Sequence, residues 1–185
     1  MITDPDYSFA TNSAYRIRSR YGWKDYSTPI EHIIRNTSGV ALLPYSETSD
    51  PELCKAESEN GFIQHDFLTN RSIIFYNDHN DFRIIRFTLA HEFGHFVLNH
   101  AMDDENTNAE ANCFARNLLC PIPLADLLEL QTPDDYSCCF DVTHQAASIS
   151  YSFRSNDRYH LSKKLYNDAQ DAFERFIIGY EPDYA

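Results

Sequence analysis

Helical periodicity is clearest between Phe82 and Asn99, where apolar side chains recur at steps of three and four residues. Asn80 and Asp81 precede this stretch and are good N-terminal caps. Further apolar residues extend the stripe nearly all round the helix, which is typical of a buried helix. The apolar positions are Phe82, Ile84, Ile85, Phe87, Leu89, Phe93, Phe96, Val97 and Leu98. The pattern therefore predicts a helix of the core over residues 82–99.

Shorter patterns predict the other elements. Before the core helix we expect helices over residues 10–21 and 28–34, a strand over residues 40–43, and a hairpin over residues 61–78 with its turn at Thr69-Asn70. After it we expect a loop or ragged helix start over residues 103–108, and helices over residues 109–119, 140–154 and 156–178. Pro121 and Pro123 should stop the first of these later helices.

This order of elements indicates a mainly helical α+β fold, with a small antiparallel sheet ahead of the core helix and helices at the C-terminal end. A chain of 185 residues is long enough for one well-buried core and hardly for two. We therefore expect one domain over residues 1–185. Residues 1–60 would hold the first helices and strand, residues 61–125 the hairpin and the two central helices, and residues 126–185 the C-terminal helices.

Charge and cysteine content narrow the class of protein. The net charge of −13 argues against direct binding to nucleic acid, because phosphate binding relies on clustered Lys and Arg. The N-terminus lacks the basic and apolar regions of a signal peptide, and no apolar run approaches the length of a membrane span. The five cysteines are odd in number and have no C-x-x-C spacing, as expected for a reduced cytoplasmic protein.

Residues 91–95 read His91-Glu92-Phe93-Gly94-His95, an H-E-x-x-H pattern inside the core helix. Residues four apart lie on one helix face, so His91 and His95 can direct two imidazoles at one metal ion. Glu92 leans over the open side of such a site, where a carboxylate can take a proton from water. This pattern predicts a Zn²⁺ site with Glu92 as general base. The competing structural explanation is a pair of hydrogen-bonded core histidines.

Several segments together resemble one family, the ImmA/IrrE-type metallopeptidases of bacteria, phages and integrative elements. The similar segments, in the family's order, are residues 73–77, residues 86–95 followed by His100, residues 110–121, and residues 140–147. The resemblance implies a zincin-like, zinc-dependent endopeptidase. It also implies a protein substrate, often a transcriptional repressor of the helix-turn-helix type, and no membrane partner.

The third metal ligand departs from the family's pattern. The family usually supplies a Glu at the position that Asn108 occupies in this chain. Helical phase favours Asn108, whereas ligand chemistry favours Glu110, since a carboxylate binds zinc better than a neutral amide. We select Glu110 as the predicted ligand, with Asn108 and Glu105 as alternatives. Glu110 could instead form a capping box with Thr107.

Two other functions remain open from the sequence. The Glu-to-Asn departure is compatible with a degenerate site that has lost its metal, in a protein that binds a partner or senses a signal. Residues 142–149 resemble a fragment of a helix-turn-helix, although they lack the basic charge of a DNA reader. For residues 142–149 we favour a helix that packs on the peptidase core.

Overall fold

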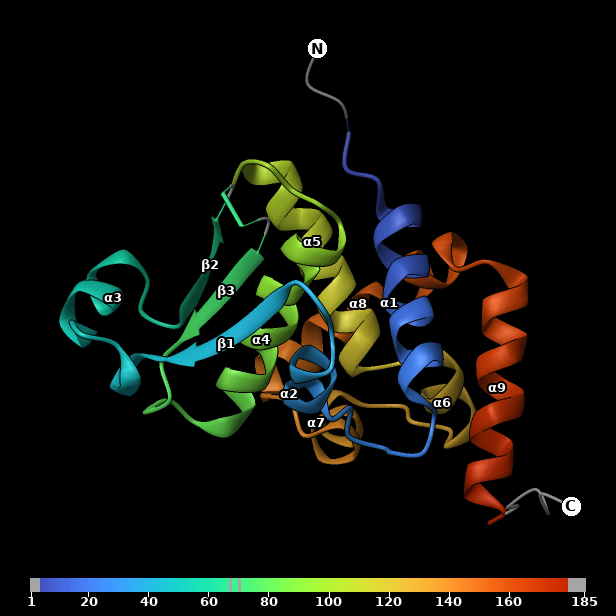
Figure 1. Ribbon diagram of the computed structural model, residues 1–185. Coiled ribbons are helices and arrows are strands. Elements are labelled where there is room, and N and C mark those ends of the chain that lie inside the picture. Colours follow the sequence, from blue (N-terminus) through green and yellow to red (C-terminus); the bar gives the residue numbers. More distant parts are fainter. Residues whose placement is uncertain (1–3, 67, 70, 180–185) are drawn as a thin grey trace, which may run out of the picture.

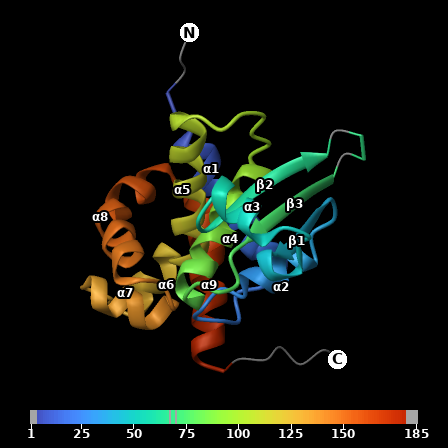
Figure 2. The same ribbon diagram turned by 90° about the vertical axis from the view of Figure 1, so that its left-hand side faces the viewer.

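The computed structural model describes residues 4–66, 68–69 and 71–179, and it has the expected mainly helical α+β fold (Figure 1). The elements are α1 (Tyr7–Tyr21), α2 (Ile30–Arg35), β1 (Val40–Pro44), the 3-10 helix η1 (Tyr45–Glu47), α3 (Pro51–Glu57), β2 (Gly61–Asp66), β3 (Arg71–Tyr76), α4 (Phe82–Val97), α5 (Glu105–Leu119), α6 (Ile122–Leu127), α7 (Pro133–Phe140), α8 (His144–His160) and α9 (Lys163–Ile177). In Figures 1 and 2 the sheet lies on one side of α4, and α1, α8 and α9 lie on the other. None of the described helices is long and apolar enough to cross a membrane.

The sheet is mixed, and the prediction of an antiparallel sheet was wrong in this respect. Strands β2 and β3 form the expected antiparallel hairpin, in which Phe62 pairs with Phe75. Strand β1 instead pairs parallel to β3, because η1 and α3 keep the chain at the end of the sheet where β1 finishes, β2 then runs back, and β3 returns in the direction of β1. The strand order β1-β3-β2 leaves β2 at the edge that packs on α4. Of the predicted turn, Asn70 lies outside the described residues.

Helix α4 is the predicted core helix and packs closely on α5. It begins at Phe82, capped by the Asp81 side chain, and ends at Val97, two residues before the predicted end. Gly94 permits the close contact, because an added Cβ would lie 3.1 Å from the Phe114 ring and 3.3 Å from the Ala111 backbone. A larger residue at position 94 would therefore separate the two helices that carry the candidate site.

Helix α5 begins earlier than predicted and has a different cap. It starts at Glu105, and the Asp104 side chain accepts hydrogen bonds from the Asn106 and Thr107 amides. Thr107 completes a capping box with Asp104, so the predicted box between Thr107 and Glu110 was wrong. The acidic segment, predicted as a loop or a ragged helix start, is therefore a helix start that supplies its own cap.

The C-terminal helices are shifted from their predicted positions. Helices α8 and α9 meet at Leu161 and Ser162 rather than near residue 155. Asp157 holds the end of α8 against α5 through a buried ion pair with Arg116, whose Nε lies 2.6 Å from Asp157 Oδ2. Helices α3, α6 and α7 were not predicted. Each has six to eight residues and begins beside a proline, a signal read as a loop or stop.

Candidate metal centre

Three potential metal-binding atoms meet where α4 faces the first turns of α5. His91 and His95 lie one turn apart on α4, and their Nε2 atoms are 3.1 Å apart. Asn108 on α5 brings its side-chain Oδ1 to 3.2 Å from His91 Nε2. Two nitrogens that share a tetrahedral zinc ion lie roughly 3.3 Å apart, given Zn–N distances of about 2.0–2.1 Å. The observed spacing therefore fits a single metal ion.

Hydrogen bonds at the opposite ring nitrogens determine which tautomer each histidine adopts. His91 Nδ1 lies 3.0 Å from Asn112 Oδ1, an acceptor that requires the proton on Nδ1. His100 Nε2 donates to Glu110 Oε2 at 2.9 Å, which leaves His100 Nδ1 free to accept from His95 Nδ1 at 3.0 Å. Neutral His91 and His95 therefore both carry their proton on Nδ1. This arrangement is typical of metal-binding histidines, whose second nitrogen is held by a polar partner.

The Nε2 atoms of His91 and His95 and the Oδ1 atom of Asn108 consequently carry no proton, and their lone pairs point toward one another. The amide of Asn108 is fixed in this orientation because its Nδ2 donates to the Asp104 carbonyl and to the Asp103 carboxylate. Burial lowers the pKa of His91 and lowers that of His95 to about 4. Both rings are therefore neutral near pH 7, and no ring proton separates the facing lone pairs. A bound cation satisfies all three lone pairs, and the donor set thus fits a metal ion.

Glu92 lies in the same cavity as these ligands. The cavity has a volume of about 490 Å³ and is bounded by β2, α4 and the loop between α4 and α5. Burial, and to a smaller extent nearby Asp103, raise the pKa of Glu92 to about 8, although the Ile63 amide opposes the shift by donating to the carboxylate. A cation bound at His91 and His95 would also oppose it. The carboxylate is therefore positioned to exchange a proton with a molecule in the cavity.

The structure does not bring Glu110 or Glu105 to the two imidazoles. Glu110 Oε1 accepts a 2.7 Å hydrogen bond from the Asp6 amide, while Oε2 bonds His100. Glu105 is exposed at the start of α5. Within residues 4–66, 68–69 and 71–179, no group of three or more His, Cys, Asp and Glu side chains is arranged to hold a metal. The third donor at the site is instead the Asn108 amide.

Two functional residues of this site were missed or undervalued in the sequence. Asp103 lines the cavity and accepts a hydrogen bond from Asn108. It lies five residues before Asn108, outside the helical spacing that guided the search, and belongs to a segment predicted as a loop or a ragged helix start. His100 was noted as the histidine beyond the core helix and as a weak candidate partner of a metal ligand, and it links His95 to Glu110.

The segment that carries this site matches a known family. A family model described as the IrrE N-terminal-like domain, of a peptidase family, matches residues 49–137. This segment belongs to the ImmA/IrrE-type peptidase family. The match includes His91, Glu92, His95 and Asn108, and membership of the ImmA/IrrE-type family implies a metal cofactor. No curated protein matches the chain significantly.

Proposed function

We propose that this protein is a zinc-dependent endopeptidase with His91, His95 and Asn108 Oδ1 as metal ligands. The observation that carries the proposal is the meeting of three unprotonated donor atoms beside the Glu92 carboxylate, on the segment that matches a peptidase family. Zinc would supply the Lewis acidity that activates water and polarises a peptide carbonyl. The family resemblance supports zinc as the metal.

Glu92 is the proposed general base. Its carboxylate takes a proton from the attacking water and passes it to the nitrogen of the leaving amine. The Ile63 amide orients the carboxylate, and partial burial keeps its pKa close to neutral, which suits a group that both accepts and donates a proton. The chemistry thus requires only one protonatable side chain besides the metal ligands.

Asn108 and Asp103 together take the place of the carboxylate ligand expected in this family. A neutral amide alone leaves the charge of a zinc ion uncompensated. The Asp103 carboxylate hydrogen-bonds the Asn108 Nδ2, which polarises the amide and increases the negative charge on Oδ1. Asp103 also places a negative charge in the same cavity. We assign Asp103 a positioning role at the metal.

The substrate class is inferred from the family resemblance. ImmA/IrrE-type peptidases often act on a repressor of the helix-turn-helix type, and we propose a regulatory protein of this kind as the substrate. The protein would then act by cleaving a repressor rather than by binding nucleic acid, in agreement with its net charge of −13.

The test combines metal content with proteolysis. Protein purified after growth with added zinc should hold about one equivalent, and it should cleave a co-expressed helix-turn-helix repressor or denatured casein. His91→Ala with His95→Ala should abolish both zinc binding and cleavage. Full proteolysis by a protein without zinc would contradict the proposal.

One observation, the neutral third ligand Asn108, favours a second function in which the protein binds a partner without catalysis. If Asn108 leaves the metal too weakly bound, the protein would act as a binding module for a regulatory partner. The same metal analysis separates the two functions, because absence of zinc after zinc-rich growth would support the binding module.

A further inference from the structure

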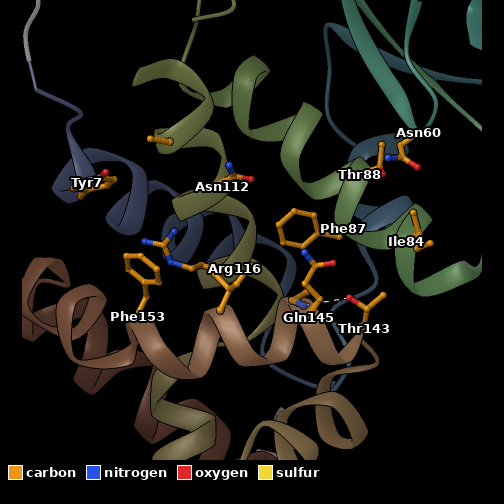
Figure 3. A pocket seen from close by; sticks show the side chains of 13 residues that line it. Tyr7, Asn60, Ile84, Phe87, Thr88, Asn112, Arg116, Thr143, Gln145 and Phe153 are labelled. Carbon is orange, nitrogen blue, oxygen red and sulfur yellow. Dashed lines mark hydrogen bonds between the residues drawn. The ribbon is translucent and has the colours of Figure 1, made fainter. Parts of the chain in front are cut away.

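A second cavity lies beside the metal centre and has no role in the proposed chemistry. It has a volume of about 580 Å³ and is formed where α4, α5 and α8 meet (Figure 3). Figure 3 shows Phe87 from α4, Arg116 from α5 and Phe153 from α8 around this space. We call it the apolar cavity. Its size is within the range of roughly 300–1,000 Å³ that is typical of ligand sites.

The apolar cavity begins one helical turn from the metal-binding histidines. Its wall includes Asn112, the residue whose side-chain oxygen holds His91 Nδ1 at 3.0 Å. It also includes Thr88, one turn before His91 on the same face of α4. At the start of β2, Asn60 lines the apolar cavity, and the next residue, Gly61, lines the cavity that contains Glu92, which we call the catalytic cavity. A peptide that reaches the metal can therefore extend a side chain into this space.

The lining combines apolar side chains, such as Ile84 and Phe87, with uncharged polar ones, such as Asn112 and Gln145, and it favours an uncharged occupant. Among the residues that the structure describes, no Asp or Glu lines the apolar cavity, although the chain carries a net charge of −13. The one cation in the lining, Arg116, is neutralised by its buried ion pair with Asp157, and its guanidinium lies 4.6 Å from the Phe153 ring centre. Ile149 and Phe153 on α8 are 44% and 45% exposed, so apolar surface remains open to an incoming group.

We propose that the apolar cavity receives an aliphatic or aromatic side chain of the substrate next to the bond that is cleaved. This inference rests on the proposed peptidase function. It makes α8 the element that selects the substrate, because Ile149 and Phe153 form the outer wall. The preferred substrates are then peptides with a large apolar residue beside the cleavage site, and peptides with an acidic residue there are poor ones.

Small hydroxamates that bind zinc test the proposal without requiring turnover. The probes are acetohydroxamate, 4-methylpentanohydroxamate with a leucine-like chain, and 4-carboxybutanohydroxamate with an acidic end, each titrated into zinc-loaded protein. We expect the leucine-like probe to bind about 10- to 200-fold more tightly than acetohydroxamate, as for apolar groups in a matched pocket. The acidic probe should show no such gain, because the cavity offers no free cation to pair with it.

Variants of α8 test whether the tighter binding of the leucine-like probe comes from the apolar cavity. Ile149→Asp should remove the advantage of the leucine-like probe and leave acetohydroxamate binding unchanged. Tyr159→Ala is the matched control, because Tyr159 lies on the same helix, is 85% exposed and does not line the apolar cavity. Circular dichroism of each variant checks that α8 is intact.

The outcomes separate this inference from the proposed function. Failure of acetohydroxamate to bind would contradict the zinc site itself. Normal acetohydroxamate binding with no gain for the leucine-like probe would overturn the apolar cavity as a side-chain site. A dimer that dissociates on Ile149→Asp in sedimentation experiments would also overturn it, since a second copy of the chain would then occupy the cavity.

Discussion

The two cavities that flank His91 share the walls of α4 and α5 and differ in their chemistry. The catalytic cavity is lined by imidazoles and by carboxylates, among them Glu92 and Asp103. The apolar cavity has no carboxylate among the described residues that line it, and Ile149 and Phe153 of α8 form part of its wall. The boundary between them is a hydrogen bond, from His91 Nδ1 to Asn112 Oδ1.

The difference follows from one helix face whose composition changes along its length. On α4, Ile84 and Phe87 contact the apolar cavity, and one to two turns later His91 and His95 contact the catalytic cavity. Every third or fourth residue of a helix returns to the same side, so a single stripe can carry recognition at one end and chemistry at the other. Substitutions at the two ends should therefore have separable effects on binding and on turnover.

The largest effect is expected at Glu92. Glu92→Gln keeps the size of the side chain and removes the base, so proteolysis should fall by about 100- to 10,000-fold while zinc stays bound. Cleavage of casein and metal content of the same preparation measure the two properties. Glu57→Gln is the control, because Glu57 lines the same cavity at the end of α3 and has no proposed role. Full proteolysis by Glu92→Gln with zinc bound would contradict the mechanism.

The next largest effect concerns the pair that replaces the expected carboxylate. Asp103→Asn should weaken zinc binding by roughly 10- to 100-fold, the usual effect of removing an outer partner of a ligand. Asn108→Glu should strengthen zinc binding, because it supplies a charged ligand at the position that faces His91. Competition with a chelating dye measures both affinities.

A double-mutant cycle distinguishes a positioning role of Asp103 from direct ligation. If Asp103 acts through the amide, its removal should have little effect in the Asn108→Ala background, since the hydrogen bond is already lost. An equal loss of affinity in both backgrounds would identify Asp103 as a ligand in its own right.

The sequence predicted the central helix and the hairpin because both have strong local signals. The periodic stripe and the Asp81 cap gave the start of α4 at the correct residue. The parallel pairing of β1 with β3 depends on how η1 and α3 carry the chain, and no local pattern records that path. The C-terminal helix boundary has a local signal that the sequence analysis missed, because Ser162 caps α9 by accepting a hydrogen bond from the Leu165 amide.

The candidate site was predictable to the extent that it is carried by a helix. His91, Glu92 and His95 follow from spacing alone, and the structure places all three around one cavity. The environment of Asn108 could not be inferred, because its carboxylate partner Asp103 lies before the Asp104 cap of α5, where helical spacing does not apply. Glu110 looked attractive for its charge, yet its position is determined by contacts with His100 and the Asp6 amide.

The smallest effect is expected at Glu110. This variant tests whether Glu110 is a metal ligand or a residue that positions His95 through His100. Glu110→Gln should keep about one equivalent of zinc and weaken its binding by roughly 10-fold, because the single, uncharged oxygen of Gln cannot replace both carboxylate oxygens that accept from the Asp6 amide and from His100 Nε2. Nitrogen chemical shifts of metal-free protein should show the His95 proton less firmly held on Nδ1, a change that a purely structural residue would not cause. Glu105→Gln is the control, because Glu105 is exposed at the first position of α5. It should leave both the zinc affinity and the His95 chemical shifts unchanged. Complete loss of zinc from Glu110→Gln would make Glu110 the third ligand after all, and would require α5 to turn so that this carboxylate replaces Asn108 beside His91.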